Sequence, residues 1–194
     1  MRYIGIDPGA SGGFAVLDDD GRAWACPMPK TYRGIRQVLD RLTESRTRRV
    51  EAVLENVWSS PGWGHAGAFS FGQNFGALQG MLECYDIEPT LVVPVKWQNV
   101  MQCRTPKARR EELGHTDKNI NKALAEQLFP GFEVTHAIAD ALLLAAYCRN
   151  LYGSQLPFLS AKEEPTHDQA RRTKTRQARG QAKSREVVAE GSPA

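Results

Sequence analysis

The sequence predicts an α/β protein with a mixed five-stranded sheet, three strands antiparallel and then two parallel, flanked by helices. The first 28 residues contain three short β-prone runs separated by turn residues, the pattern of an antiparallel meander. Two later apolar runs, 50–57 and 89–94, each follow a helical segment, as parallel strands do. The segment 135–148 is rich in alanine and leucine on nearly all sides, which predicts a buried helix capped by Thr135.

Composition sets the class of protein. The 194 residues are 41% hydrophobic, enough for one substantial core. No stretch is apolar for long enough to span a bilayer, and the N-terminus lacks a basic segment followed by an apolar one. The four cysteines form no C-x-x-C pair, so we expect reduced thiols with no zinc site and no disulfide framework. We therefore expect a cytoplasmic protein with no membrane association.

The chain divides by charge and complexity near residue 160. We expect a folded domain over 1–160 and a basic, disordered tail over 161–194. The tail contains eight Lys/Arg against five Asp/Glu and so carries the whole net charge of +3. Such a run is usually a solvated arm, and here it is also able to hold phosphates.

The connecting segments predict further helices. An amphipathic pattern over 31–45 and a glycine-containing one over 70–85 indicate two helices between the strands. Gly72, Gly76 and Gly80 share one face of the second helix and would permit close approach to a neighbouring sheet or helix. A polar, basic connection follows from Lys96, and a last short helix is expected over 119–129.

Three carboxylates stand at notable places in these elements. Asp7 ends the first strand, Glu55 ends a buried later strand, and Asp140 lies inside the buried helix with His136 one turn before it on the same face. If the three acids converge, their negative charge requires cations, and hard oxygen ligands suit Mg²⁺ or Mn²⁺. Alternatively, Asp7 belongs to an ordinary Asp-Pro-Gly turn and each acid is separately paired with an arginine.

Two other features admit less specific readings. The three aspartates of 18–20 precede Gly21 and fit a hairpin tip better than a metal cluster. Trp58 and Trp63 lie in a glycine-rich loop, where they either fold back on the core or stack on nucleic-acid bases.

The order of elements matches the ribonuclease H-like arrangement, in which acids from the first strand, the fourth strand and the last helix meet. Several motifs resemble the RuvC-type Holliday junction resolvases over about residues 1–152: Gly5-Ile6-Asp7-Pro8-Gly9, Val53-Leu54-Glu55, Gly72-Gln73-Asn74-Phe75-Gly76, Val93-Pro94-Val95-Lys96-Trp97 and Ala139-Asp140-Ala141-Leu142. A compact, divergent member of this family would be unsurprising in a bacteriophage.

The resemblance implies roles for individual residues. Asp7, Glu55 and Asp140 match the family's catalytic, metal-binding acids. His136 is the nearest match to a further ligand that the family carries about one turn before the last acid, although this sequence has Ala137 at the i−3 position of the bacterial members. His136 is then either a ligand of the second ion or a residue that helps to protonate the leaving group.

The resemblance also implies residues that bind nucleic acid. Trp58, three residues after Glu55, fits the family's aromatic residue that disturbs base stacking at the junction centre. Lys96 and Lys118 match basic positions near the scissile phosphate.

The expected function is a structure-selective DNA endonuclease of recombination and repair. It would cut four-way or other branched DNA by two-metal-ion phosphodiester hydrolysis, with Mg²⁺ as the cofactor and Mn²⁺ as a substitute. We expect a homodimer, because a four-way junction has approximate two-fold symmetry. The helix over 72–80 is the expected interface, although core packing explains its glycines equally well.

Three alternative functions are compatible with parts of the same sequence. They are a non-catalytic nucleic-acid-binding protein on the same fold, a related nuclease acting on RNA, and an ATPase of the actin or sugar-kinase type. The last needs two such domains, for which this chain is too short.

Overall fold

The structure, a computed structural model, describes residues 1–43, 49–58, 64–104 and 117–153. The chain divides into two units, Met1–Leu156 and Pro157–Ala194. All elements discussed below belong to the first unit. The predicted tail over 161–194 lies outside the described residues.

The sheet has the predicted architecture. Its order is β3-β2-β1-β4-β5, with antiparallel pairing from β1 through β2 to β3 and parallel pairing from β1 through β4 to β5. The strands are β1 (Arg2–Asp7), β2 (Gly13–Asp18), β3 (Ala23–Pro27), β4 (Val50–Glu55) and β5 (Thr90–Val92). The mixed five-stranded sheet expected from the sequence is thereby confirmed.

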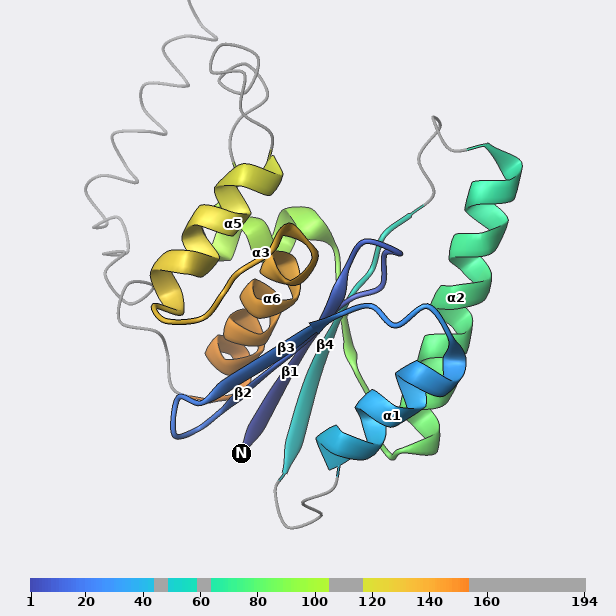
Figure 1. The fold of residues 1–194 in the computed structure, drawn as a ribbon, viewed down its shortest axis with the longest axis horizontal. Helices are drawn as coiled ribbons and strands as arrows, with labels where there is room; N and C mark the ends of the chain where they lie inside the picture. Colours follow the sequence, from blue (N-terminus) through green and yellow to red (C-terminus); the bar gives the residue numbers. More distant parts are fainter. Residues whose placement is uncertain (44–48, 59–63, 105–116, 154–194) are drawn as a thin grey trace, which may run out of the picture. The chain divides into compact units, whose positions relative to one another are not determined.

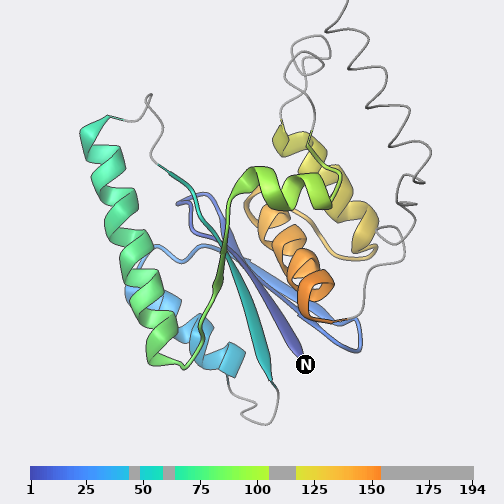
Figure 2. The same ribbon diagram turned by 180° about the vertical axis from the view of Figure 1, so that it is seen from behind.

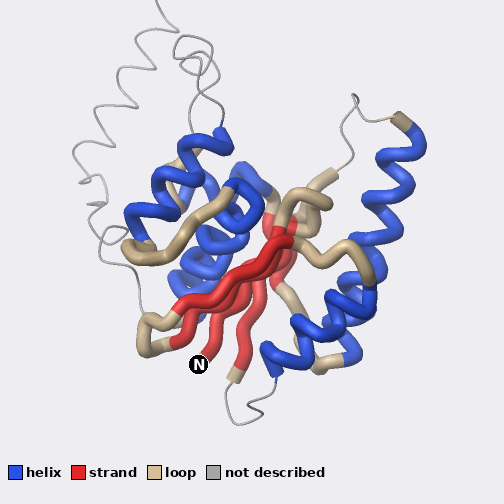
Figure 3. Tube along the Cα trace, viewed as in Figure 1, coloured by secondary structure: helices blue, strands red, loops and turns tan. Residues whose placement is uncertain are grey.

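Helices cover both faces of the sheet. In Figures 1 and 2, α1 and α2 lie on one face, and α3, α5 and α6 lie on the other; Figure 3 shows the strands between these two helical layers. The described helices are α1 (Tyr32–Thr43), α2 (His65–Cys84), α3 (Pro94–Val100), α5 (Asp117–Leu128) and α6 (His136–Tyr152). No helix of the described part is long and apolar enough to cross a membrane.

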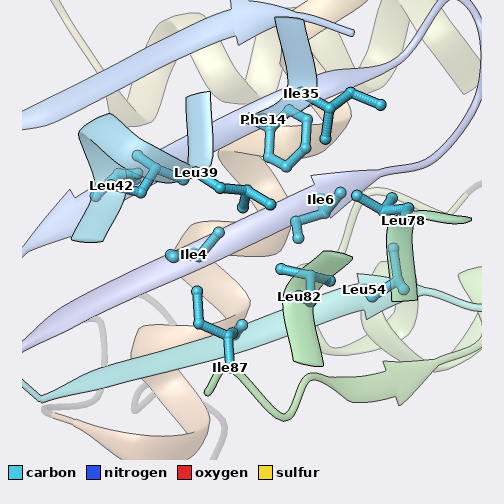
Figure 4. Close-up of a cluster of buried hydrophobic side chains, with 12 residues drawn as sticks. Ile4, Ile6, Phe14, Ile35, Leu39, Leu42, Leu54, Leu78, Leu82 and Ile87 are labelled. Carbon is cyan, nitrogen blue, oxygen red and sulfur yellow. The ribbon is translucent and has the colours of Figure 1, made fainter. Parts of the chain in front are cut away.

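An apolar core lies between the sheet and the α1–α2 layer. Because side chains alternate along a strand, Ile4 and Ile6 face this layer while Gly5 between them faces α6. Figure 4 shows the labelled core side chains: Ile4, Ile6, Phe14, Ile35, Leu39, Leu42, Leu54, Leu78, Leu82 and Ile87. Burying each such side chain stabilises the fold by about 1.5–3 kcal/mol.

Glycines allow α6 to lie directly on the strands. A Cβ at Gly5 would be 2.2 Å from the carbonyl oxygen of Ala141 and from the amide nitrogen of Ala145. A Cβ at Gly13 would be 2.9 Å from the carbonyl oxygen of Ala137. Gly13 pairs with Asp7 across the antiparallel ladder, so the first turns of α6 are level with the end of β1.

The acidic hairpin tip is explained by local partners. Asp18 accepts a hydrogen bond of 3.0 Å from Arg2, Asp19 accepts one of 2.8 Å from the hydroxyl of Tyr3, and Asp20 pairs with Arg22. These contacts agree with the hairpin reading of the sequence. The four cysteines are free thiols, as expected.

Several element boundaries differ from the expectations. The basic connection expected from Lys96 begins as a helix, because Pro94 occupies its first turn and Trp97 and Met101 are both buried one turn apart. Helix α2 starts at His65 rather than near residue 70. Thr135 is at the N-cap of α6 but makes no side-chain cap hydrogen bond.

The glycine face of α2 is open in this chain. Among the described residues, a Cβ at Gly72, Gly76 or Gly80 would meet nothing within 4 Å. The explanation of these glycines by core packing is therefore wrong. Their part in an interface stays a prediction.

Candidate active site

Asp7 and Glu55 end two neighbouring parallel strands at the same edge of the sheet. The register pairs Ile6 of β1 with Leu54 of β4, so the next residues along the two strands are Asp7 and Glu55. Adjacent strands lie about 4.8 Å apart. Because Ile6 and Leu54 face the α1–α2 layer, both carboxylates are on the side of the sheet that α6 covers.

Asp140 reaches this edge from the second turn of α6. The helix is held against β1 and β2 at Gly5 and Gly13, and Asp140 lies between the contact points Ala137 and Ala141. Unlike residues 141–148 that follow it in α6, Asp140 is only partly buried. The fold thus brings the carboxylates of β1, β4 and α6 into one neighbourhood.

The pKa of Glu55 is affected by the other two acids. Its side chain is buried, with 7% of the residue exposed. Burial first, then the negative charges of Asp7 and Asp140, raise the pKa of Glu55 from 4.5 to about 8, against a hydrogen bond from Trp97 that lowers it. A carboxylate destabilised in this way is stabilised by a cation, so the donor set fits a hard divalent metal ion.

Each acid is also held by a neutral donor. The backbone N–H of Gly9 donates to Oδ1 of Asp7 over 3.0 Å. The indole N–H of Trp97 donates to Oε1 of Glu55 over 2.7 Å, and the side-chain amide of Asn121 donates to Oδ1 of Asp140 over 2.7 Å.

The turn after β1 fits closely around Asp7. A Cβ at Gly12 would be 2.4 Å from the carboxyl carbon of Asp7. Gly12 also donates its backbone N–H to the carbonyl of Gly9 over 2.9 Å. The Asp-Pro-Gly turn therefore donates a hydrogen bond to the carboxylate of Asp7 and leaves space for it. The interpretation as an ordinary turn is thus compatible with the predicted role of Asp7 as a metal ligand.

The acids do not by themselves form a coordination shell. Within the described ranges, no three His, Cys, Asp or Glu side chains are grouped closely enough to hold a metal ion. His136, the first residue of α6, is exposed and stands four residues before Asp140. Its role as a ligand or as a proton donor stays a prediction.

The predicted nucleic-acid contacts lie on elements next to the acids. Trp58, three residues beyond Glu55, is 77% exposed, so it does not fold back on the core. Lys96 is exposed on α3, next to Trp97. Lys118 is in the first turn of α5, and its side chain is outside what the structure describes; Trp63 is likewise outside the described residues.

Trp97 and Asn121 are contacts of the acids that the sequence did not identify as site residues. The sequence offers one indication for Asn121, a polar residue placed one turn before Ala125 on the apolar face of α5; both residues are buried. Trp97 lies within one of the motifs quoted above, but nothing in its neighbours indicates a bond to Glu55.

Comparison with known proteins gives a structural match only. No family model and no curated protein matches the chain. The structure of RuvC from Thermus thermophilus is similar with a TM-score of 0.54 and 16% identity, over 78% of this chain and 95% of that one. The structure of T. thermophilus RuvC in complex with Holliday junction substrate is similar with a TM-score of 0.54 and 14% identity, over 80% of this chain and 99% of that one. The chain therefore has the RuvC-type, ribonuclease H-like fold.

Proposed function

We propose that this protein is a metal-dependent endonuclease that cuts four-way or otherwise branched DNA. The observation that carries the proposal is the placement of acids from β1, β4 and α6 at one edge of a RuvC-type sheet, where the charges of Asp7 and Asp140 add to burial in raising the pKa of Glu55. A buried carboxyl with two further acids beside it is unfavourable unless a positive charge meets these acids. They are favourable where divalent cations bind.

Asp7, Glu55 and Asp140 are the residues that would hold Mg²⁺, with Mn²⁺ as a substitute. A pair of divalent ions in such a site activates a water and stabilises the leaving oxygen of a phosphodiester. The chain supplies fixed oxygen ligands, because Asp7, Glu55 and Asp140 are each held by a donor. His136, at the exposed start of α6, would act as a further ligand or as the proton donor to the leaving group.

The surroundings of the acids suit a nucleic-acid backbone and unpaired bases. An exposed tryptophan has a flat apolar face on which a base stacks, a contact worth about 1–3 kcal/mol per base. Trp58 offers such a face next to Glu55, and Lys96 and Lys118 would contact phosphates beside the acids. The basic tail over 161–194 would add contacts to phosphates that depend on salt.

A homodimer built through α2 would place two such sites on one branched substrate. The open glycine face of α2 leaves room for a second helix to approach closely. Two-fold symmetry of the protein would then match the approximate symmetry of a four-way junction.

The function is tested by incubating the purified protein with labelled four-way, flap and linear DNA, and with a four-way RNA, in Mg²⁺, Mn²⁺ or EDTA. We expect symmetric nicks in the four-way DNA with either metal and none in EDTA. Asp7→Asn, Glu55→Gln and Asp140→Asn should each abolish cleavage and leave junction binding in place. His136→Ala should slow turnover, and Glu88→Gln, at an exposed acid after α2, is the matched control.

Three outcomes would contradict the proposal. Full activity in any one of the three acid variants would remove that residue from the site. Junction binding without cleavage under every metal condition would indicate a non-catalytic binding protein. Cleavage of the RNA substrate alone would assign the protein to the RNA-directed nucleases.

A further inference from the structure

Two of the three acids are held by buried side chains that carry no charge. Trp97, on α3, is completely buried and donates to Glu55, and Asn121, on α5, is 2% exposed and donates to Asp140, both over 2.7 Å. The two donors come from different helices and each bonds a different acid. Two independent elements therefore orient the ligands of the candidate metal site.

The neutrality of these donors matters for cation binding. A lysine or arginine at either position would neutralise the carboxylate and compete with a metal ion for it. An indole N–H is only a donor, and the one in Trp97 donates to the carboxylate of Glu55 beside it. The bond fixes the direction of Glu55 without placing a positive charge beside it.

Asn121 has a second polar atom that the protein does not satisfy. A carboxylate accepts hydrogen bonds, so the amide nitrogen of Asn121 faces Asp140 and its Oδ1 must point elsewhere. This Oδ1 is buried and has no hydrogen-bond partner among the described residues. An unsatisfied buried acceptor costs about 1–3 kcal/mol, which calls for a donor at this place.

A hydrated divalent cation is a donor of the right kind. Mg²⁺ retains several of its waters in protein sites, and those waters are strong hydrogen-bond donors. The amide group of Asn121 would thus serve both partners, its nitrogen for Asp140 and its oxygen for the hydrated ion.

We propose that Trp97 and Asn121 are positioning residues of the metal site, holding Glu55 and Asp140, with Oδ1 of Asn121 accepting from the hydrated cation. The inference rests on the proposed function, because it assumes that these acids bind a divalent ion. Groups that orient metal ligands typically contribute 10–100-fold to metal affinity.

The test measures Mn²⁺ affinity of the full chain without DNA, by titration followed with electron paramagnetic resonance. Trp97→Phe and Asn121→Leu remove the polar atoms and keep similar shapes. We expect each to weaken Mn²⁺ binding by about 10–100-fold. Unchanged affinity in folded variants would overturn the proposal, because a merely structural bond would lower the melting temperature without changing affinity.

Matched controls come from the same chain. Asn150→Leu removes a second buried amide oxygen that has no hydrogen-bond partner among the described residues, at the far end of α6 from Asp140. Trp24→Phe removes an indole on β3 that stacks with Arg41 instead of bonding an acid. Both controls should keep the Mn²⁺ affinity of the parent protein; an equal loss in the controls would count against the proposal.

A measurement on the unmodified protein covers the case in which a variant does not fold. In a ¹⁵N-labelled sample, Mg²⁺ should shift the indole N–H signal of Trp97 and Mn²⁺ should broaden it, while the signal of Trp24 stays unchanged. The side-chain amide of Asn121 should respond in the same way. If the protein binds Mn²⁺ and neither group responds, the positioning role is wrong and the proposed function stands; if the protein neither binds Mn²⁺ nor cuts DNA, both are wrong.

Discussion

The metal-free protein should lose stability as the pH rises, and Glu55 should be the cause. Its pKa is raised from 4.5 to about 8 in the folded state by burial and by Asp7 and Asp140. The perturbation that isolates this effect is Glu55→Gln, which keeps an oxygen to accept the hydrogen bond from Trp97 but cannot ionise.

The sign follows from which state holds the proton. Below pH 4.5 the carboxyl is protonated in both the folded and the unfolded chain, and its contribution to stability is fully present. Between pH 4.5 and about 8, the folded chain keeps a proton that the unfolded chain has released, so the free energy of unfolding falls as the pH rises. Above about pH 8, Glu55 is ionised in both states and the loss is complete.

The magnitude is large enough to measure. The two pKa values are separated by about 3.5 pH units, and each unit corresponds to about 1.4 kcal/mol. From about pH 5.5 to about pH 8 the folded protein should lose roughly 3 kcal/mol through this group. For a domain of this size that is a fall in melting temperature of roughly 6–12 °C.

The assay is chemical denaturation of the two proteins in EDTA at both pH values. Titrating groups distant from Glu55 affect both proteins equally, so the difference between their pH slopes belongs to Glu55 and the two acids that interact with it. Glu55→Gln should be the more stable protein at the higher pH, and added Mg²⁺ should stabilise the parent protein more than the variant. Parallel pH profiles in EDTA would refute the raised pKa of Glu55.

Three further predictions concern the elements around the site. Gly5→Ala should destabilise the protein by about 3 kcal/mol and reduce cleavage, because its Cβ would lie 2.2 Å from the backbone of α6; normal thermal stability would contradict the packing. Gly76→Ala adds a Cβ into open space, so it should raise the unfolding free energy by about 0.5–1 kcal/mol and weaken self-association in sedimentation; unchanged association would remove this face of α2 from the interface. Deleting 161–194 should weaken junction binding and flatten its salt dependence in a titration, and an unchanged salt slope would show that the tail makes no phosphate contacts.

The sheet and the pairing of two acids were predictable because they depend on local pattern. Alternating and continuous apolar runs mark strands, and a strand that follows a helix is generally parallel to the strand before it. Two parallel strands that each end in an acid bring those acids to one edge, which is how Asp7 and Glu55 meet. The alanine- and leucine-rich pattern of α6 likewise predicted burial around Asp140.

The partners of the acids were not predictable, because they depend on how distant elements pack. The sequence predicts a polar, basic connection from Lys96 onward, and only the packed structure shows Trp97 on a helix, turned inward to Glu55. The glycine spacing of α2 predicts a helix face that another element can approach closely. It does not predict whether another part of this chain packs against that face. Asn121 is a polar residue on the apolar side of α5, which could be recognised in the sequence. Its partner Asp140, which lies 19 residues away, could not.

The site combines acids whose negative charges disfavour the metal-free state with uncharged residues that hold these acids in place. The charge comes from three acids on β1, β4 and α6, whose repulsion is seen in the pKa of Glu55. The uncharged residues are Gly5, which lets α6 touch the strand, and the two neutral donors that orient Glu55 and Asp140. A basic residue in place of either donor would neutralise the acid beside it and compete with a cation for that acid. The destabilisation of the metal-free site is therefore the same free energy that would favour a divalent cation, so changes that relieve it should weaken metal binding.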